Sequence, residues 1–234
     1  MLELRDLSKK YAGKFALKGL NLKVPSGQLC ILLGPNGAGK STLLRILCTL
    51  TRPSAGDALI NSHSITEEPI DVRRSIGAVL HEMLLYEDLT AAENLRFYSR
   101  LYGVPSEEKR IDDMLARLNL LHRKNDRVGD FSRGMKQRMS IARALISGPK
   151  VLLLDEPFTG LDVKSKDQVS SMLTEAVAGG ATILMTAHDP DMAHDLGHRL
   201  LVLVDGKLKY DQQKTSVSKT DFVSEYKRMA GAAP

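Results

Sequence analysis

The chain has 234 residues, of which 43% are hydrophobic and 26% charged, and its net charge is +5. This is enough for one sizeable globular domain, and the charge is too small to argue for nucleic acid, so we expect no nucleic-acid partner. No apolar run approaches the length of a membrane span, and the first residues lack a signal-peptide pattern. Because Cys30 and Cys48 also lie in apolar segments, we expect a cytoplasmic protein.

The first third of the sequence predicts three strands and a helix. Residues 2–7 alternate between apolar and polar side chains, as do residues 18–24, which end at the Pro-Ser-Gly turn of residues 25–27. Residues 29–33 are continuously apolar, which is typical of a strand buried on both faces of a parallel sheet. Residues 41–47 have helical character.

The middle of the sequence predicts helices only. Thr90 and Glu93 have the spacing of a capping box, and apolar residues then recur at helical spacing. A second helix is expected from Ser106, and a third from near Ser132 to a Gly-Pro stop. Residues 86–148 are therefore expected to form an all-helical insertion.

Parallel-sheet character returns in the last third. Residues 151–154 and 182–185 are short apolar runs that predict buried strands, with a helix between them at about residues 165–178. Residues 200–204 and 207–210 flank Asp-Gly and predict a hairpin. The last stretch is expected to be a short surface helix with a frayed Ala-Pro end.

A glycine-rich segment carries the first chemical signal. Residues 34–41 match the pattern G-x-x-x-x-G-K-[ST] between a strand and a helix. The glycines let backbone N–H groups turn inward to bind an anion, and the helix N-terminus adds partial positive charge. We expect ATP and Mg²⁺ as cofactors, with Lys40 on the phosphates and Ser41 on the metal ion. The predicted nucleotide-binding residues here are Gly34, Pro35, Asn36, Gly37, Ala38, Gly39, Lys40, Ser41 and Thr42.

A pair of acids carries the second signal. Asp155 and Glu156 directly follow an apolar strand, at the end where open α/β sheets bind ligands. We expect Asp155 to join Ser41 as a metal ligand and Glu156 to act as general base on the attacking water. An apolar run that ends in two acids is weak evidence for a catalytic site on its own. Together with the phosphate loop it becomes strong evidence.

Further segments complete a known pattern. Residues 131–138 read Phe-Ser-Arg-Gly-Met-Lys-Gln-Arg shortly before the two acids, and residues 158–162 read Phe-Thr-Gly-Leu-Asp directly after them. His188 follows the strand at 182–185, and Tyr11 precedes the phosphate loop. With these segments the chain resembles the ATP-binding subunits of ABC transporters from end to end.

The resemblance implies roles for single residues. Ser132 and Gly134 match the signature loop, which in this family contacts the γ-phosphate held by the opposite subunit. Asp162 matches the aspartate of the D-loop, His188 the switch histidine that joins Glu156 in catalysis, and Tyr11 the aromatic residue that stacks on adenine.

The resemblance also implies an architecture and partners. It implies an α/β fold: a P-loop NTPase (RecA-like) core with an antiparallel β subdomain and an inserted α-helical subdomain. Residues 1–234 are expected to form one ABC ATPase domain, with a nucleotide-binding core at 1–85 and 149–234 and a helical signature subdomain at 86–148. The expected partners are a second copy or a homologous ATPase subunit, packed head to tail, and integral membrane permease subunits at the inner face of the cell membrane.

The sequence departs from the family pattern at two places. Arg133 and Met135 replace a glycine and the glutamine of the signature L-S-G-G-Q. His81, followed by Glu82, takes the place of the Q-loop glutamine that normally contacts Mg²⁺ and the attacking water. We expect His81 to donate a hydrogen bond there as a third catalytic residue, and Glu82 to accept one from a bound water.

The sequence says less about the transported molecule than about the ATPase function. Segments 77–82, 85–90, 93–98 and 131–135 look like the ATPase of the haem exporter in cytochrome c maturation. The same pieces occur, less completely, in ATPases of drug and polysaccharide exporters. The expected function is therefore ATP hydrolysis that drives export, with haem as one cargo. There are two alternatives: a soluble ABC ATPase without a membrane partner, and a P-loop kinase.

Overall fold

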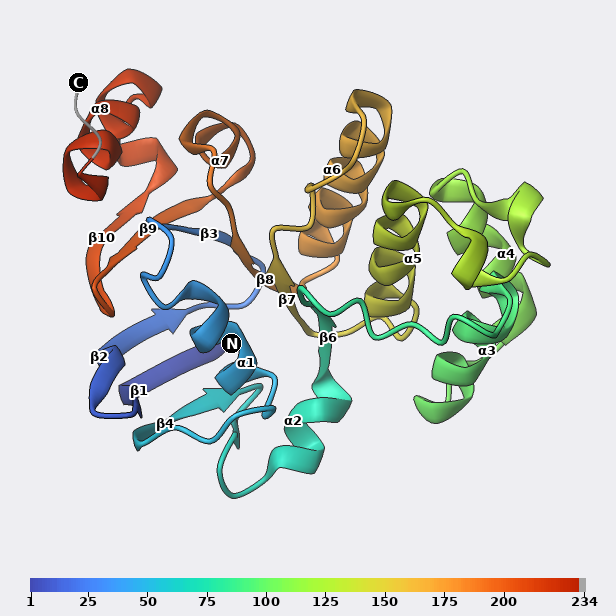
Figure 1. Ribbon diagram of the computed structural model, residues 1–234, viewed down its shortest axis with the longest axis horizontal. Coiled ribbons are helices and arrows are strands. Elements are labelled where there is room, and N and C mark those ends of the chain that lie inside the picture. Colours follow the sequence, from blue (N-terminus) through green and yellow to red (C-terminus); the bar gives the residue numbers. More distant parts are fainter. Residues whose placement is uncertain (232–234) are drawn as a thin grey trace.

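A computed structural model of the chain describes residues 1–231, so the predicted Ala-Pro end lies outside the described residues. Its centre is a six-stranded sheet with the order β10-β9-β3-β8-β7-β6 (Figure 1). Strands β9, β3, β8, β7 and β6 run parallel to one another, and β10 pairs antiparallel with β9. The strands are β3 (Leu29–Leu33), β6 (Ile76–Val79), β7 (Val151–Asp155), β8 (Thr182–Thr186), β9 (Arg199–Val204) and β10 (Lys207–Gln213).

The central sheet is buried on both faces. In β3, Leu29 and Ile31 belong to one hydrophobic cluster, whereas Cys30 and Leu32 belong to another on the opposite face. Since neighbouring side chains of a strand point to opposite faces, a strand covered on both sides needs a continuous apolar run. The predicted two-sided burial of residues 29–33 is confirmed, as is the β9–β10 hairpin.

A four-stranded antiparallel sheet covers one face, with the order β2-β1-β4-β5. Helix α1 (Lys40–Leu47) packs into the same hydrophobic cluster through its buried leucines and isoleucine. The predicted strands at residues 2–7 and 18–24 are present in longer form. The strands of this sheet are β1 (Leu2–Tyr11), β2 (Lys14–Val24), β4 (Ala55–Ile60) and β5 (His63–Ser64), and helix α2 (Pro69–Ser75) leads from it to β6.

The segment between β6 and β7 contains helices and no strand within the described residues. Its helices are α3 (Ala91–Leu101), α4 (Glu107–Arg117) and α5 (Arg133–Leu145), with the 3₁₀ turns η1 (Leu121–Arg123) and η2 (Val128–Asp130). They form a lobe beside the sheet in Figure 1. The three helices predicted from apolar periodicity and capping signals are therefore confirmed.

The remaining helices cover the face of the sheet opposite α1. They are α6 (Val163–Ala178), α7 (Pro190–Leu196) and α8 (Lys219–Ala230), with the turn η3 (Lys214–Ser216) before α8. Phe222 anchors α8, because its fully buried side chain belongs to the cluster on this face. Across residues 1–231, no helix combines the length and the apolar character that a membrane crossing requires.

The capping box at the start of α3 gives a stability prediction. The Thr90 hydroxyl accepts a hydrogen bond from the Glu93 N–H at 3.2 Å, and the Glu93 carboxylate accepts one from the Thr90 N–H at 2.8 Å. Thr90→Ala removes the hydroxyl and should lower the free energy of unfolding by about 1 kcal/mol, measured by urea denaturation. Thr215→Ala, at an exposed position outside any cap, is the control; equal losses in both variants would contradict the capping role.

The two cysteines give a reactivity prediction. Burial raises the pKa of both the Cys30 and the Cys48 thiol to about 12. Since the thiolate is the reactive form, neither thiol should react with Ellman's reagent in the native protein at pH 8. Denaturant should expose both. Rapid labelling of either cysteine without denaturant would contradict this.

Candidate nucleotide-binding site

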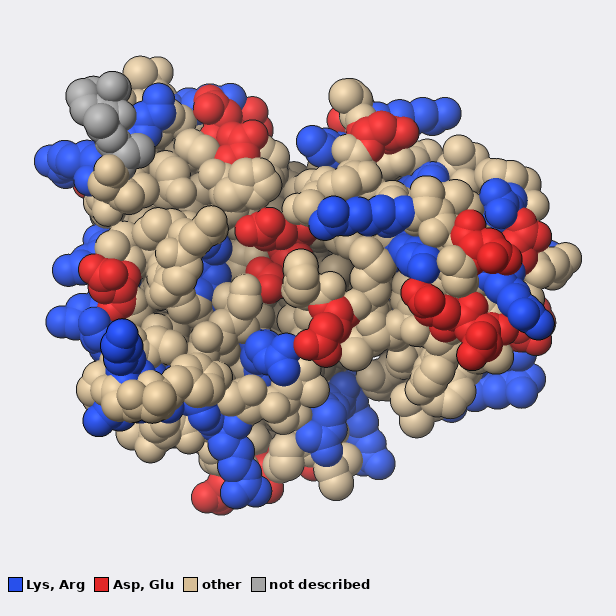
Figure 2. Space-filling model, in the orientation of Figure 1, with Lys and Arg blue, Asp and Glu red and all other residues tan. Residues whose placement is uncertain are grey.

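Three chain segments meet at the carboxyl edge of the parallel strands. The phosphate loop follows β3, Asp155 ends β7, and Thr186 ends β8 between them. The pairing register puts Thr186 level with both Leu32 and Asp155, so the loop and the acids flank one point of the edge. Figure 2 shows acidic side chains in the central hollow of the face, near the place of β7 and β8 in Figure 1.

Two glycines let the phosphate loop fit between its neighbours. A Cβ on Gly34 would lie 2.1 Å from the carbonyl oxygen of Leu203. A Cβ on Gly39 would lie 2.5 Å from the carbonyl oxygen of Ala16, and the φ of Gly39 is +109°. Neither position accepts a side chain without a shift of the backbone. The close packing therefore fixes the loop at the start of α1.

Lys40 lies inside the concave side of this loop. Its side chain is buried, and its ammonium donates hydrogen bonds to the carbonyl oxygens of Gly34 at 2.5 Å and Pro35 at 3.2 Å. Burial lowers the pKa of Lys40, while Glu156 and Asp155 act in the opposite direction. The acids are thus close enough to influence this ammonium. Ser41, the next residue, is exposed in the first turn of α1.

Thr186 holds the two acids in place. Its buried hydroxyl donates to the Asp155 carboxylate at 2.6 Å and accepts from the Glu156 N–H at 3.0 Å. One side chain thereby fixes the carboxylate of the first acid and the backbone of the second. Thr186 was not predicted from the sequence, where its only signal is a polar residue at the end of the apolar run of β8.

Glu156 has an unusual backbone, with φ at +47°. Residues other than glycine seldom adopt this left-handed region, and at functional sites it re-aims a side chain. The Glu156 carboxylate lies 3.6 Å from Nδ1 of His188 and 3.4 Å from the Thr159 hydroxyl. These residues line a cleft of about 450 Å³, so the structure brings the predicted base and the predicted switch histidine together.

The predicted signature residues lie on the other side of the acids. Ser132 caps α5 by accepting from the Met135 N–H at 3.3 Å, and Asp162 caps α6 by accepting from the Ser165 N–H at 2.8 Å. Hydrogen bonding by the Ser165 side chain, and then by its N–H, lowers the pKa of Asp162. Gly134 approaches the carbonyl oxygen of Gly160, where an added Cβ would lie 3.0 Å away.

No hydrogen bond or ion pair within residues 1–231 joins the Ser132–Gly134 turn to the phosphate loop. Figure 1 shows α1 and α5 on either side of β6, β7 and β8. The link from α5 to the acids is Gln137, whose side-chain amide donates to the Pro157 carbonyl at 2.9 Å. Gln137 is buried and was also missed by the sequence analysis.

The three remaining predicted residues lie at the periphery. His81 is exposed. Glu82, expected to accept a hydrogen bond from water, accepts one from the Arg45 guanidinium at 3.2 Å and so contacts α1. Tyr11 is 47% exposed at the end of β1, with the Lys9 ammonium 4.9 Å from the centre of its ring. Their roles in nucleotide binding and catalysis stay predictions.

The fold and this edge of the sheet define an α/β nucleotide-binding protein of the P-loop class. The family model described as "ABC transporter" matches residues 17–159. The chain belongs to this family.

Similar proteins agree with this assignment. The daunorubicin resistance ATP-binding protein DrrA3 of Streptomyces coeruleorubidus is 39% identical over 202 residues, which are 86% of this chain and 64% of that protein. The Nod factor export ATP-binding protein I of Cupriavidus pinatubonensis is 39% identical over 88% of this chain and 64% of its own length. The ABC transporter ATP-binding protein NatA of Bacillus subtilis is 35% identical, covering 90% of this chain and 88% of that protein. The chain thus spans only about two thirds of the first two relatives.

Solved structures agree with the fold. An ATP-binding subunit of an ABC transporter superposes with a TM-score of 0.87 at 30% identity, over 99% of this chain and 94% of that chain. The ATP-binding cassette MJ0796, in a dimeric post-hydrolysis state bound to ADP and Pi, gives a TM-score of 0.85 at 29% identity, over 92% of this chain and 99% of that chain. The predicted fold class is confirmed, and the chain has the fold of an ABC ATP-binding domain.

Proposed function

We propose that the chain binds MgATP and hydrolyses it as one of two ATPase subunits that drive export through separate membrane subunits. The observation that carries this is the convergence of Lys40 in its loop with the two acids that Thr186 holds. A buried cation in a glycine-rich loop, beside two carboxylates, fits a metal-bound triphosphate, whose phosphates the loop N–H groups and Lys40 would bind. The family membership supports the same function.

The site residues fit both cofactors. The Ser41 hydroxyl and the Asp155 carboxylate are oxygen ligands of the kind that Mg²⁺ prefers, and the metal ion would neutralise phosphate charge. Lys40 and the loop N–H groups would hold the β- and γ-phosphates. Glu156 would accept the proton of the attacking water, with His188 beside it and His81 nearby. Tyr11 would stack on adenine.

A second chain would complete each site. We propose that residues 86–148 act as a helical signature subdomain that presents Ser132 and Gly134 to the nucleotide of the opposite subunit, with Asp162 at the contact between subunits. The position of α5 across the sheet from α1 supports this, and so does the dimeric form of the cassette MJ0796. The partner is a second copy or a homologous ATPase.

The segment from His81 to Tyr86 is our candidate contact with a permease. Leu84 and Tyr86 are 43% and 47% exposed, so these apolar groups are available to a partner. The helical lobe holds the backbone of this segment: Tyr98 donates to the Leu84 carbonyl at 2.9 Å, and Ser140 to the Met83 carbonyl at 3.0 Å. A permease helix bound here would place the chain at the inner face of the cell membrane and would move with the lobe.

Charged substitutions test this contact. Leu84→Glu, alone and with Met83→Glu, should sharply lower the fraction of the chain that sediments with membranes containing its permease. Docking would remove water from the introduced carboxylate, and this desolvation costs binding free energy. ATP binding by the purified chain should stay unchanged. Leu121→Glu, at another exposed leucine that does not line the depression shared by Leu84 and Leu50, is the control. Unaltered membrane recruitment of the Met83 and Leu84 variants would exclude this surface.

Relatives guide the choice of cargo. DrrA3 is named for daunorubicin resistance and protein I of Cupriavidus pinatubonensis for Nod factor export. We propose export of an organic molecule of such a class; haem, which segments such as 77–82 indicate, stays a narrower prediction. Co-purification with a membrane protein distinguishes a transporter subunit from a soluble ABC ATPase, and a phosphorylated acceptor would indicate a kinase.

The decisive experiment is Mg²⁺-dependent ATP hydrolysis measured against protein concentration. A site shared between two chains should give a rate per chain that rises with concentration until the dimer forms. A rate per chain that does not vary with concentration, from a protein that stays monomeric with ATP, would contradict the shared site.

A further inference from the structure

A second cavity lies at the opposite edge of the sheet from the acids. It is a groove of about 550 Å³ between α4 and α6, with Leu152 of β7 at its floor. Helix α4 contributes Arg110, Met114 and Arg117, which the helical repeat places on one face. Because β7 begins at Val151 and ends at Asp155, the floor lies near the amino end of the strand, away from the nucleotide.

Basic groups predominate around this groove. Arg110, Arg117 and Lys150 line it, and Glu175 is the one acidic side chain among the residues that do so. Glu175 already accepts from the Arg117 guanidinium at 2.6 Å, across the groove from α6 to α4. Within residues 1–231, no acidic side chain forms an ion pair with Arg110 or Lys150. Their donors therefore remain available to a ligand.

The loop after α5 positions one of these cations. The φ of Gly148 is +65°, and a Cβ on this glycine would lie 3.0 Å from Nη2 of Arg110. A side chain at this position would push the guanidinium away from the turn, and the positive φ also favours glycine here. Lys150 is exposed two residues further along the same loop. Arg110 and Lys150 thus border the groove at the same turn.

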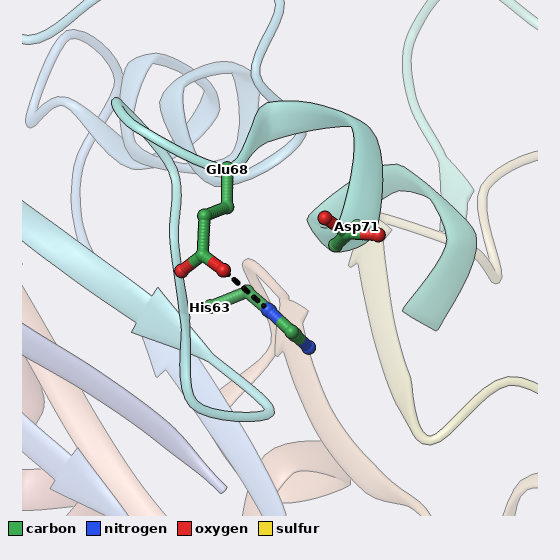
Figure 3. Close-up of side chains that lie close together, drawn as sticks. All are labelled: His63, Glu68 and Asp71. Atoms are coloured by element: carbon green, nitrogen blue, oxygen red, sulfur yellow. Dashed lines mark hydrogen bonds and ion pairs between the residues drawn. The ribbon is translucent and has the colours of Figure 1, made fainter.

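An acidic cluster near this turn forms no ion pair with Arg110 or Lys150 within the described residues. His63, Glu68 and Asp71 lie close together (Figure 3). His63 and Asp71 line a smaller depression that shares Lys150 with the groove. The Glu68 carboxylate lies 3.1 Å from Nδ1 of His63, and Asp71 forms an ion pair with Arg74 at 3.5 Å. Both acids are already paired. The Glu68–His63 hydrogen bond and the Asp71–Arg74 ion pair account for this surface cluster.

We propose that the groove binds a small organic anion with an apolar body. Its charged group would lie between Arg110 and Lys150, and its apolar part would pack along Leu145, Met114 and Met172. The volume is in the range of small-molecule sites, and a cationic rim over an apolar floor is complementary to such a ligand. One wall belongs to the helical lobe and the other to α6, so the ligand would contact both.

The probe for this site is 8-anilinonaphthalene-1-sulfonate, an aromatic sulfonate whose fluorescence rises in apolar surroundings. It is titrated into the full chain with saturating MgADP, so that the nucleotide site is filled. Arg110→Ala/Lys150→Ala should raise the dissociation constant at least about tenfold, because charge-assisted hydrogen bonds are lost. Arg52→Ala/Lys207→Ala removes one exposed arginine and one exposed lysine elsewhere and should leave it unchanged.

A second probe separates charge from apolar contact. N-phenyl-1-naphthylamine lacks the sulfonate, so it should bind more weakly than the first probe. Its dissociation constant should be the same for the groove double variant and the control double variant. Circular dichroism checks folding, and Lys150→Gln, at an exposed residue, gives the same comparison if the groove variant fails to fold. The proposal is overturned if the sulfonate binds the groove variant as tightly as the wild type.

Discussion

Glu156→Gln should lower the rate of Mg²⁺-dependent ATP hydrolysis by about 10²- to 10⁴-fold, the usual contribution of a general base. Glutamine is nearly the same size as glutamate but does not accept the proton of the attacking water. The Glu156 N–H would still donate to Thr186, so the backbone should keep its position. ATP affinity should therefore change little, which a fluorescent ATP analogue measures.

The same change should have a structural effect. If hydrolysis opens the dimer, a chain that binds ATP without cleaving it should remain dimeric, and size-exclusion chromatography with MgATP should show a stable dimer. Glu67→Gln is the matched control, since Glu67 is exposed and has no ion pair among the described residues. Full activity of Glu156→Gln would reject Glu156 as the base and would leave the kinase alternative standing.

Local sequence patterns predicted much of this site because each depends on neighbouring residues. The glycines of the phosphate loop and the Thr90 capping box act within a few positions of the chain, so their spacing alone is informative. The apolar runs of β3 and β7 reflect burial on two faces, which composition also reveals. The edge at which Asp155 lies then follows from the topology of a parallel sheet.

Elements that depend on distant partners were not predicted. β6 reads Ile-Gly-Ala-Val, too short and too small to indicate a strand. Its Gly77 is explained by α5, because a Cβ there would lie 2.1 Å from the Ala144 carbonyl oxygen. Thr186 is similar, since its role comes from acids about thirty residues earlier. A local sequence pattern does not show contacts between residues that are far apart in the chain. These contacts are visible only in the folded structure.

The Q-loop region shows the same limit. His81 and Glu82 were expected to share the role of a missing glutamine, from position alone. The structure adds Arg45, which pairs with Glu82 across 37 positions of sequence. Arg45 lies on α1 three residues after Thr42, so this exposed pair links the candidate permease contact to the helix that follows the phosphate loop.

Two inactive variants should restore activity to each other when they are mixed. Lys40→Ala removes the buried ammonium of the phosphate loop and should reduce hydrolysis by about 10²- to 10³-fold, the effect of losing one preorganised charge donor. Gly134→Asp places a carboxylate in the signature turn, where it would repel the γ-phosphate of the opposite subunit. Lys207→Ala is the control for an unrelated lysine, and circular dichroism checks that each variant folds.

Recovery in the mixture follows from the geometry of a shared site. A mixed dimer has one site with both defects and one with neither, because the intact loop of the Gly134→Asp chain meets the intact signature turn of the Lys40→Ala chain. Random pairing should therefore return about a quarter of the wild-type rate if the two sites of a head-to-tail dimer act independently. A site built within one chain gives no recovery, since every chain carries a defect. A mixture as inactive as its components would contradict the shared site, even if each chain dimerises.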